Sequence, residues 1–191
     1  MQFAGDFRFC SWNGQALFAR KCHRHHPKMR FALSLANAHD VVMLQETHGN
    51  EGREAALRLP GNRAAFWSDG TAHQAGVGML ISHEFLEHFN PVAPQDWVEV
   101  VPGRVAMLRL RGPEGALDLV TVYLPTGPQT TAEKRNMMSR LAQFIEDPHQ
   151  VLTVLAGDFN FVTTSRDRVN KQSGNFTGGW IRTARRTSRR S

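Results

Sequence analysis

The hydrophobic positions of this chain fall mostly into short runs, several of which stop at a polar side chain. Residues 151–156 form one such run, and Gly157 and Asp158 follow it directly. An apolar run of this length that ends at a glycine predicts a strand buried on both faces of a sheet. If the extended geometry continues, Asp158 and Asn160 point to the same side and suit a phosphate or a hard metal ion. The alternative is an Asx turn that only caps the strand.

Three earlier segments end in the same way. Residues 7–13 alternate between apolar and polar positions and end at Asn13, which predicts a strand with an amide at its end. An apolar run at 41–44 leads to Glu46, where a carboxylate is well placed to bind Mg²⁺. Tyr123 follows a further apolar run, and half-buried strand packing explains this tyrosine as well as a functional role does.

The remaining pattern predicts an α/β fold in which helices cover sheets. Apolar residues at helical spacing, with start and stop signals, predict helices over 29–38, 50–59 and 130–147, the last opened by a capping box from Thr130 to Glu133. Short apolar runs between turn signals predict strands at 65–67, 76–81, 97–101, 105–110 and 117–124. The turn at 112–115 joins the last two of these strands as a hairpin.

Composition indicates one folded domain with a sizeable core. The chain has 191 residues, of which 41% are hydrophobic and 21% charged. No apolar stretch is long enough to span a membrane, and no secretory signal is visible at the N-terminus. The two cysteines, Cys10 and Cys22, are too few for a disulfide framework, so we expect a reducing, intracellular location.

The positive charge is concentrated at the C-terminal end. Residues 163–191 contain eight basic residues and one acidic residue, which leaves 15 basic and 16 acidic residues for 1–162. We therefore predict a domain over 1–162 and a basic, largely disordered tail rich in Ser, Thr, Gly and Arg over 163–191. Such a tail is compatible with nucleic-acid binding and with a nuclear address, although a solvated end explains its charge more simply.

Together, these segments resemble the endonuclease/exonuclease/phosphatase superfamily over about residues 5–170. The similarity rests on Ser11-Trp12-Asn13, Leu44-Gln45-Glu46-Thr47, the strand at 76–81, residues 122–125 and Gly157-Asp158-Phe159-Asn160, which occur in the order and approximate spacing of that superfamily. The continuation from Phe161 to Arg168 is most similar to the endonuclease domains of non-LTR retroelements, which resemble apurinic endonucleases. The resemblance implies a four-layer α/β sandwich of two mainly antiparallel sheets with helices outside.

The resemblance also implies a Mg²⁺-dependent phosphodiesterase, most simply a DNA endonuclease, with Mn²⁺ as an alternative ion. Glu46 would hold the ion with help from Asn13, and Asp158 would orient or deprotonate the attacking water. Asn160 and Tyr123 would hydrogen-bond the charged transition state. His48 stands where the family usually has a lysine and would contact the substrate. Phosphoinositide, sphingomyelin and nucleotide substrates are alternatives within the superfamily.

The chain departs from the family at its C-terminal end. The Ser-Asp-His motif of the family is absent, since no histidine follows His149. We therefore expect a truncated copy with an incomplete second sheet, whose uncovered edge favours self-association. Two hypotheses follow: an endonuclease that manages without these residues or takes them from a partner, and a catalytically impaired relic of one.

Overall fold

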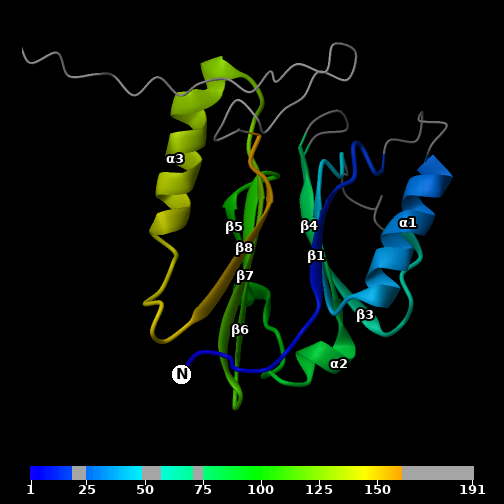
Figure 1. The fold of residues 1–191 in the computed structure, drawn as a ribbon, viewed down its shortest axis with the longest axis vertical. Coiled ribbons are helices and arrows are strands. Elements are labelled where there is room, and N and C mark those ends of the chain that lie inside the picture. The colour runs from blue at the N-terminus through cyan, green and yellow to red at the C-terminus, as the bar shows by residue number, and fades with distance from the viewer. Residues whose placement is uncertain (19–24, 49–56, 71–74, 161–191) are drawn as a thin grey trace, which may run out of the picture. The chain divides into compact units, whose positions relative to one another are not determined.

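Two four-stranded sheets face each other in this computed structural model, and a helix lies on the outer side of each (Figure 1). The strands in chain order are β1 Phe9–Asn13, β2 Val41–Gln45, β3 Arg63–Ser68, β4 Val77–Ser82, β5 Trp97–Val101, β6 Val105–Gly112, β7 Gly115–Tyr123 and β8 Leu152–Asp158. The helices are α1 His25–Ala38, α2 His83–Leu86 and α3 Thr131–Ala142, with short 3₁₀ helices η2 Pro94–Asp96 and η3 Pro128–Thr130.

The structure describes residues 1–18, 25–48, 57–70 and 75–160. All the elements above belong to one compact unit, Met1–Phe159, while Asn160 begins a second unit that is considered separately. The predicted tail at 163–191 and most of the helix predicted at 50–59 lie outside the described residues. Within the described residues, no helix is both long and apolar enough to cross a membrane.

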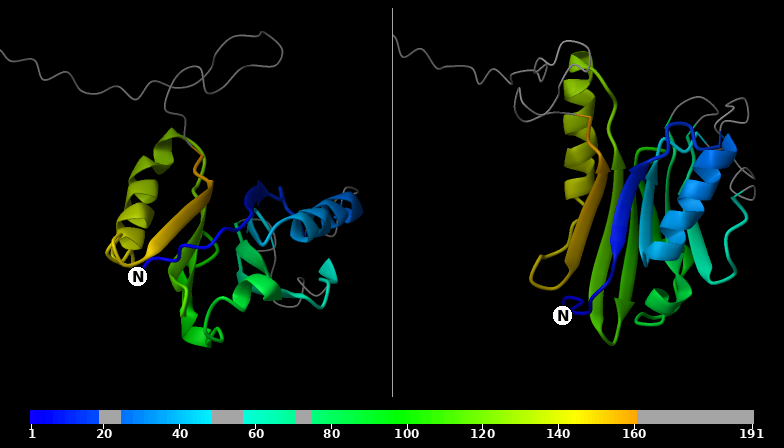
Figure 2. Two further views of the ribbon diagram at one scale, coloured as in Figure 1. Left: turned by 60° about the horizontal axis from the view of Figure 1, so that its bottom comes forward. Right: turned by 45° about the vertical axis from the view of Figure 1, so that its right-hand side comes forward.

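Each sheet combines one parallel strand pair with antiparallel pairs. The first sheet has the order β1-β2-β4-β3 and the second has the order β5-β6-β7-β8. The parallel pairs are β1 with β2 and β7 with β8, and their crossovers contain α1 and α3. Parallel neighbours need such long connections, which explains why the helices occur there. The predicted four-layer sandwich of two mainly antiparallel sheets is therefore confirmed, as the two turned views in Figure 2 also show.

Three apolar clusters hold these layers together. Between the sheets, Val41, Met43, Met79 and Ile81 pack against Leu108, Leu110, Leu117 and Leu119. On the outer face of the first sheet, α1 buries Met29, Ala32 and Ala36 against β2 and β4. On the outer face of the second sheet, α3 buries Met137 and Leu141 against β6 and β7. The strict alternation of inward and outward side chains in β2 and β6 follows from the pleat of a strand.

Strand β8 is less buried than its sequence predicts. Among the described residues it lies at one edge of the second sheet, opposite β5, and it pairs with β7 alone. Leu155 on its outer face is 39% exposed, whereas Val154 and Ala156 pack at the margin of the core between the sheets. The prediction of a strand buried on both faces is wrong, because a continuous apolar run does not distinguish a central strand from an edge strand.

The predicted capping box at the start of α3 is also wrong. Thr130 is the residue before the helix, but its side chain makes no capping hydrogen bond. Its hydroxyl donates instead to the carbonyl oxygen of Gly127 at 2.7 Å. The short η3 helix precedes α3 and gives Thr130 a φ of -91° and a ψ of 8°, outside the extended region that a capping side chain requires.

Candidate active site

The candidate site lies where several strands end at the same edge of the sandwich. Strand β1 ends at Asn13, β7 ends at Tyr123 and β8 ends at Asp158, and Glu46 follows the last residue of β2. Strands β1 and β2 belong to the first sheet, and β7 and β8 belong to the second. The site therefore contains residues from both sheets. Rigid strand ends hold polar groups in position better than long loops do.

The side-chain amide of Asn13 joins the two carboxylates of the site. Its Nδ2 donates to Glu46 Oε1 at 2.9 Å and to Asp158 Oδ2 at 2.8 Å. Its Oδ1 accepts from the backbone N–H of Gln15 at 2.9 Å, which fixes the orientation of the amide. Asn13 therefore links a carboxylate of the first sheet to a carboxylate of the second.

An unusual backbone conformation brings Glu46 to this position. Met43 of β2 faces the second sheet and Leu44 faces α1, so regular alternation would turn Glu46 toward α1. Glu46 instead has a φ of 51°, in the left-handed region that residues other than glycine seldom adopt. This turn lets the carboxylate of Glu46 reach Asn13. Strained backbone of this kind is typical of functional sites.

A small polar pocket opens beside Glu46, next to the hydrogen bonds of Asn13. Its volume is about 330 Å³, and its lining includes Glu46, His48, Arg104, Tyr123 and Thr126. Burial raises the pKa of Tyr123 to about 12, and a hydrogen bond to Glu46 together with the negative charge of that residue adds to the effect. The phenol therefore stays protonated at neutral pH and donates to the carboxylate.

Arg104 is a pocket residue that was not predicted from the sequence. Its guanidinium lies 4.7 Å from the centre of the Tyr123 ring, which is a cation-π arrangement. Its positive charge partly opposes the rise in the pKa of the phenol. The predicted hairpin could have indicated the position of Arg104. Val105 pairs with Val122, so the residue before Val105 must lie next to Tyr123.

The structure brings most of the predicted site residues together. Asn13, Glu46 and Asp158 share hydrogen bonds, and Tyr123 and His48 line the pocket beside Glu46. Asn160 belongs to the second unit, and its φ of 48° shows that the extended geometry of β8 does not continue to it. The pairing of Asp158 and Asn160 on one strand face therefore does not follow from strand alternation.

The carboxylate oxygens of this site suit a hard cation that prefers oxygen ligands and keeps some of its water ligands. Among the described residues, no set of three or more His, Cys, Asp or Glu side chains is arranged to hold a metal ion. Mg²⁺ does not need such a set, because it keeps several waters and uses one or two carboxylates. Glu46 and Asp158, joined through Asn13, provide carboxylates of this kind.

Comparison with known proteins gives the family. The profile described as the Endonuclease/Exonuclease/phosphatase family matches residues 10–191. The chain belongs to this family. The "Transposon TX1 uncharacterized 149 kDa protein" of Xenopus laevis is a relative that is 31% identical over 132 residues. The match covers 68% of this chain and 9% of that protein, so the chain spans a small part of its relative.

Several solved structures share the fold described above. The AP endonuclease LMAP from Leishmania major has a TM-score of 0.61 at 18% identity, over 86% of this chain and 58% of its own. D. rerio TDP2 complexed with a single strand DNA product has a TM-score of 0.59 at 18% identity, over 81% of this chain and 60% of its own. The chain thus spans less than two thirds of each of these structures.

Proposed function

We propose that this chain is a Mg²⁺-dependent phosphodiester hydrolase that cuts DNA, an endonuclease of the retroelement or apurinic type. The observation that carries the proposal is the Asn13 amide, which holds Glu46 and Asp158 together at the junction of the two sheets. The transposon relative and the AP endonuclease fold support the choice of reaction. Mn²⁺ would substitute for Mg²⁺, since it prefers the same oxygen ligands.

Glu46 and Asn13 form the metal side of the proposed site. Glu46 would hold the ion with its carboxylate, and Asn13 would assist and keep that carboxylate oriented. When bound, the ion supplies positive charge that polarises the phosphoryl oxygen and stabilises the departing oxyanion.

Asp158 and Tyr123 carry the remaining chemistry. Asp158, fixed by Asn13, would orient or deprotonate the attacking water. Tyr123 remains protonated because its pKa is raised to about 12, so its hydroxyl would donate to a phosphoryl oxygen whose charge grows in the transition state. We assign Asn160 to the same charge stabilisation on the basis of its family motif.

His48 and Arg104 form the proposed substrate side of the pocket. Both line it together with Tyr123, and Arg104 brings a permanent positive charge that suits a backbone phosphate. Nuclear localisation is a further proposal, which rests on the arginines of 163–191.

Cleavage of supercoiled plasmid and of an oligonucleotide duplex with one abasic site tests this function. The full chain is assayed with Mg²⁺ and with EDTA, beside Glu46→Gln, Asp158→Asn and Glu133→Gln. Glu133 is an exposed carboxylate in the first turn of α3 and is the matched control. We expect about a hundredfold to thousandfold loss of rate for the first two variants, and none for the control.

Three results are informative. Mg²⁺-dependent cutting that both site variants abolish supports the endonuclease. Cutting that neither variant affects overturns it. No cutting by a folded, monodisperse sample supports the alternative of a catalytically impaired relic that keeps the metal side of the site.

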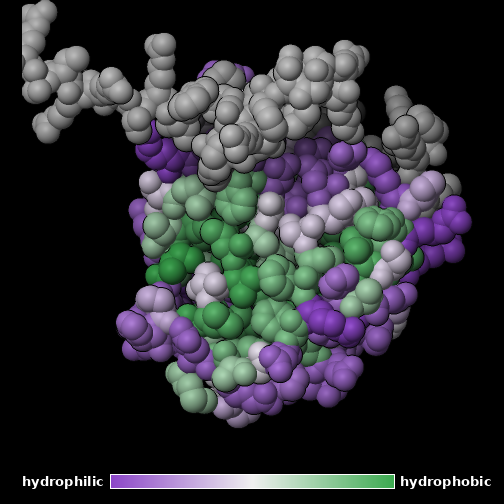
Figure 3. Space-filling model, in the orientation of Figure 1, coloured by the Kyte–Doolittle hydropathy of each residue, from purple (hydrophilic) through white to green (hydrophobic). Residues whose placement is uncertain are grey.

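We further propose that two copies associate through β8. Among the described residues β8 ends the second sheet, and it has no charged residue before Asp158 and no proline, the usual protections of an edge strand. Apolar side chains gather on the face where β8 lies beside β1, as Figure 3 shows. Each of these strands also has a large exposed apolar side chain, Leu155 at 39% and Phe9 at 45%. A two-fold axis at Leu155 would pair β8 with its own copy in antiparallel fashion, with Val154 opposite Ala156 and no charges opposed.

Light scattering on the purified chain tests this association. Leu155→Lys places a charge at the centre of the proposed pairing, and Ile145→Lys is the control because Ile145 is 38% exposed outside any strand. We expect a dimer for the wild type and the control and a monomer for Leu155→Lys. A monomeric wild type would rule the pairing out.

A further inference from the structure

A polar side chain is buried between the two sheets directly below the candidate site. Gln45, the last residue of β2, is 1% exposed. The preceding inward-facing residues of the same strand, Val41 and Met43, belong to the apolar core between the sheets. An amide in such surroundings is costly unless its hydrogen-bonding groups are satisfied. Its presence therefore needs an explanation beyond packing.

Gln45 satisfies both ends of its amide and connects three strands. Its Nε2 donates to Thr121 Oγ1 of β7 at 3.0 Å, and Thr121 is fully buried. Its Oε1 accepts from Ser11 Oγ of β1 at 3.2 Å. The first of these hydrogen bonds crosses from one sheet to the other, while the second stays within the first sheet.

Each member of this network lies close in sequence to a residue of the candidate site. Ser11 is two positions before Asn13 and Thr121 is two positions before Tyr123, so each pair shares one face of its strand. Gln45 directly precedes Glu46. The network therefore lies directly beside the polar groups of the site, further into the space between the sheets.

Directional bonding matters at this place because the apolar core between the sheets offers little of it. The other hydrogen bonds of this kind lie at the margins: Asn13 donates to Asp158 at the candidate site, and at the side where β3 faces β5, Ser68 donates to Glu99 and Trp97 donates to the carbonyl oxygen of Trp67. The core between the sheets is made of aliphatic and aromatic side chains, whose attraction depends on buried area rather than on orientation. Such contacts tolerate small shifts of one sheet against the other. A buried hydrogen bond of fixed length does not, because a shift would leave both partners unsatisfied.

We propose that Gln45 is a positioning residue, whose hydrogen bond to Thr121 fixes the offset between the sheets so that Asn13 and Glu46 on one meet Asp158 and Tyr123 on the other. This proposal rests on the proposed function for its kinetic consequence. Its structural consequence, the closeness of Asn13 and Asp158, is independent of any activity.

The test removes the hydrogen bond without changing the packing. Gln45→Met and Thr121→Val are close in shape to the native residues, and the double variant removes both partners together. Ser11 also loses its acceptor on Gln45, but Ser11 is exposed and its hydroxyl can bind water instead. The double variant therefore leaves no buried group unsatisfied, and we expect it to unfold at the same urea concentration as the wild type, or higher. Met43→Leu, on the same face of β2, is the control for core substitution, and Thr121→Ser is the conservative variant that keeps the hydroxyl.

Two readouts decide the outcome. The first is the kinetics of DNA cleavage: we expect kcat of the double variant to fall about tenfold to a hundredfold with KM unchanged, the effect of a small misplacement of catalytic groups. The second is hydrogen exchange of the Asn13 side-chain NH₂, followed by NMR in EDTA, which we expect to accelerate in the double variant. The two control variants should behave as the wild type in both experiments.

The proposal is overturned if the double variant is folded and retains both the wild-type kcat and the slow exchange of Asn13. If the wild type does not cut DNA, the proposed function fails and the exchange experiment alone decides on Gln45. If the double variant does not fold, Thr121→Val alone is subjected to the same two readouts, with the same expected and contradicting results.

Discussion

The side-chain amide of Asn13 lies 2.8 Å from the carboxylate of Asp158, although 145 residues separate them in the chain. The same amide contacts Glu46 at 2.9 Å, so one neutral group separates two acidic ones. In the absence of a cation, these two hydrogen bonds help to offset the repulsion between the carboxylates. The stability of the folded chain should therefore depend on Asn13 and on divalent ions together.

Asn13→Ala should destabilise the fold, and the loss should be larger in Mg²⁺ than in EDTA. We expect about 2 kcal/mol of destabilisation in EDTA, since hydrogen bonds to charged groups contribute about 1.5 to 3 kcal/mol. With saturating Mg²⁺ the loss should grow, because Asn13 helps to hold the ion and the variant therefore gains less stability from binding it. Urea unfolding in the two buffers measures both values. Asn37→Ala, at an exposed position of α1, is the control and should show neither effect. An equal loss of stability for Asn13→Ala in both buffers would argue against a shared cation site.

Gly157→Ala should displace the end of β8. Gly157 has a φ of 150°, and a Cβ atom there would overlap with the carbonyl oxygen of Val122. Strand β8 would have to move away from β7, which carries Asp158 out of place and lowers both the unfolding midpoint and the cleavage rate. Gly61→Ala is the control, because nothing lies within 4 Å of its Cβ position. Unchanged cleavage by Gly157→Ala would show that the site does not need β8 in this position.

The phenol of Tyr123 should titrate unusually late. It is the single tyrosine of the chain, so absorbance near 295 nm reports it alone. Its folded pKa is raised to about 12, whereas the unfolded value is near 10, so the stabilising contribution is complete below about pH 10 and is lost as the pH rises through 12. Glu46→Gln should lower the folded pKa, because it removes a negative charge beside the phenol. A transition near pH 10 in the native protein would contradict the hydrogen bond to Glu46.

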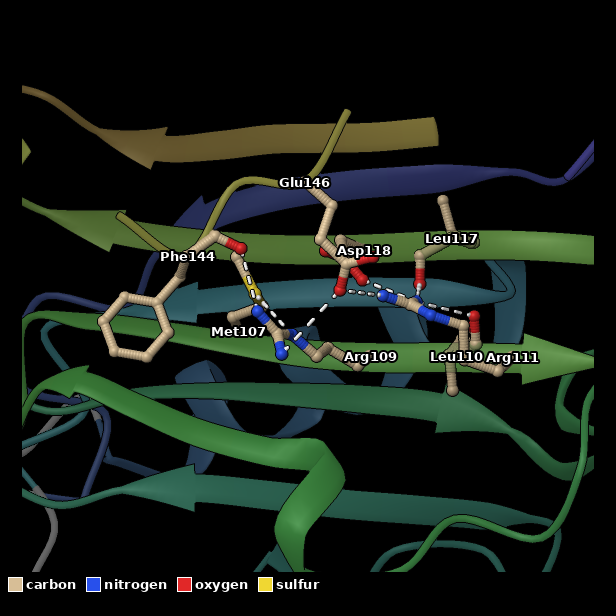
Figure 4. Close-up of polar contacts among 8 residues, drawn as sticks. All are labelled: Met107, Arg109, Leu110, Arg111, Leu117, Asp118, Phe144 and Glu146. Carbon is tan, nitrogen blue, oxygen red and sulfur yellow. Dashed lines mark hydrogen bonds and ion pairs between the residues drawn. The ribbon is translucent and has the colours of Figure 1, made fainter. Parts of the chain in front are cut away.

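A second polar cluster joins the second sheet to residues that follow α3 in the chain (Figure 4). Arg111 donates to the fully buried Asp118 at 2.7 Å and to Glu146 at 2.9 Å. Arg109 donates to the carbonyl oxygen of Phe144 at 2.8 Å. The two arginines thereby fasten the connection between α3 and β8 to the sheet. Burial raises the pKa of Asp118, and its contact with Arg111 partly opposes that rise.

Arg111→Met should leave Asp118 as a buried, uncompensated charge. We expect about 3 kcal/mol of destabilisation at neutral pH, at the lower end for a broken buried pair because Arg111 is one third exposed. An acid with a raised folded pKa is more stable in its protonated form, so the loss should diminish as the pH falls. The double variant Arg111→Met with Asp118→Leu should recover most of the stability. Arg140→Met on the exposed side of α3 is the control, and a double variant no better than the single one would contradict this reasoning.

The sequence predicted the positions of the strand ends well, because a strand that enters a buried sheet and stops at a polar group leaves a clear local pattern. Asn13, Tyr123 and Asp158 each end a strand, as their apolar runs indicate. What it could not predict depends on contacts between distant segments. The exposure of Leu155 depends on β8 having a neighbour on one side only, and the position of Glu46 depends on a φ of 51° that no local pattern signals.

Arg104 illustrates the same limit from the other side. It stands in a turn beside Gly103, where an arginine is unremarkable, and it becomes a pocket residue only through the register of β6 against β7. Likewise, the glutamine before Glu46 is part of a recognisable motif, but its burial and its bond to Thr121 depend on how the two sheets face each other.

The order of the strands along the chain determines when the site can form. Glu46 follows the second strand, whereas Asp158 ends the last strand of the compact unit and reaches its place only after α3 has crossed over and β8 has paired with β7. A nascent polypeptide that has emerged from the ribosome as far as α3 holds only one of the two carboxylates. The nuclease activity proposed for this chain would thus switch on only after β8 has emerged and docked onto the sheet.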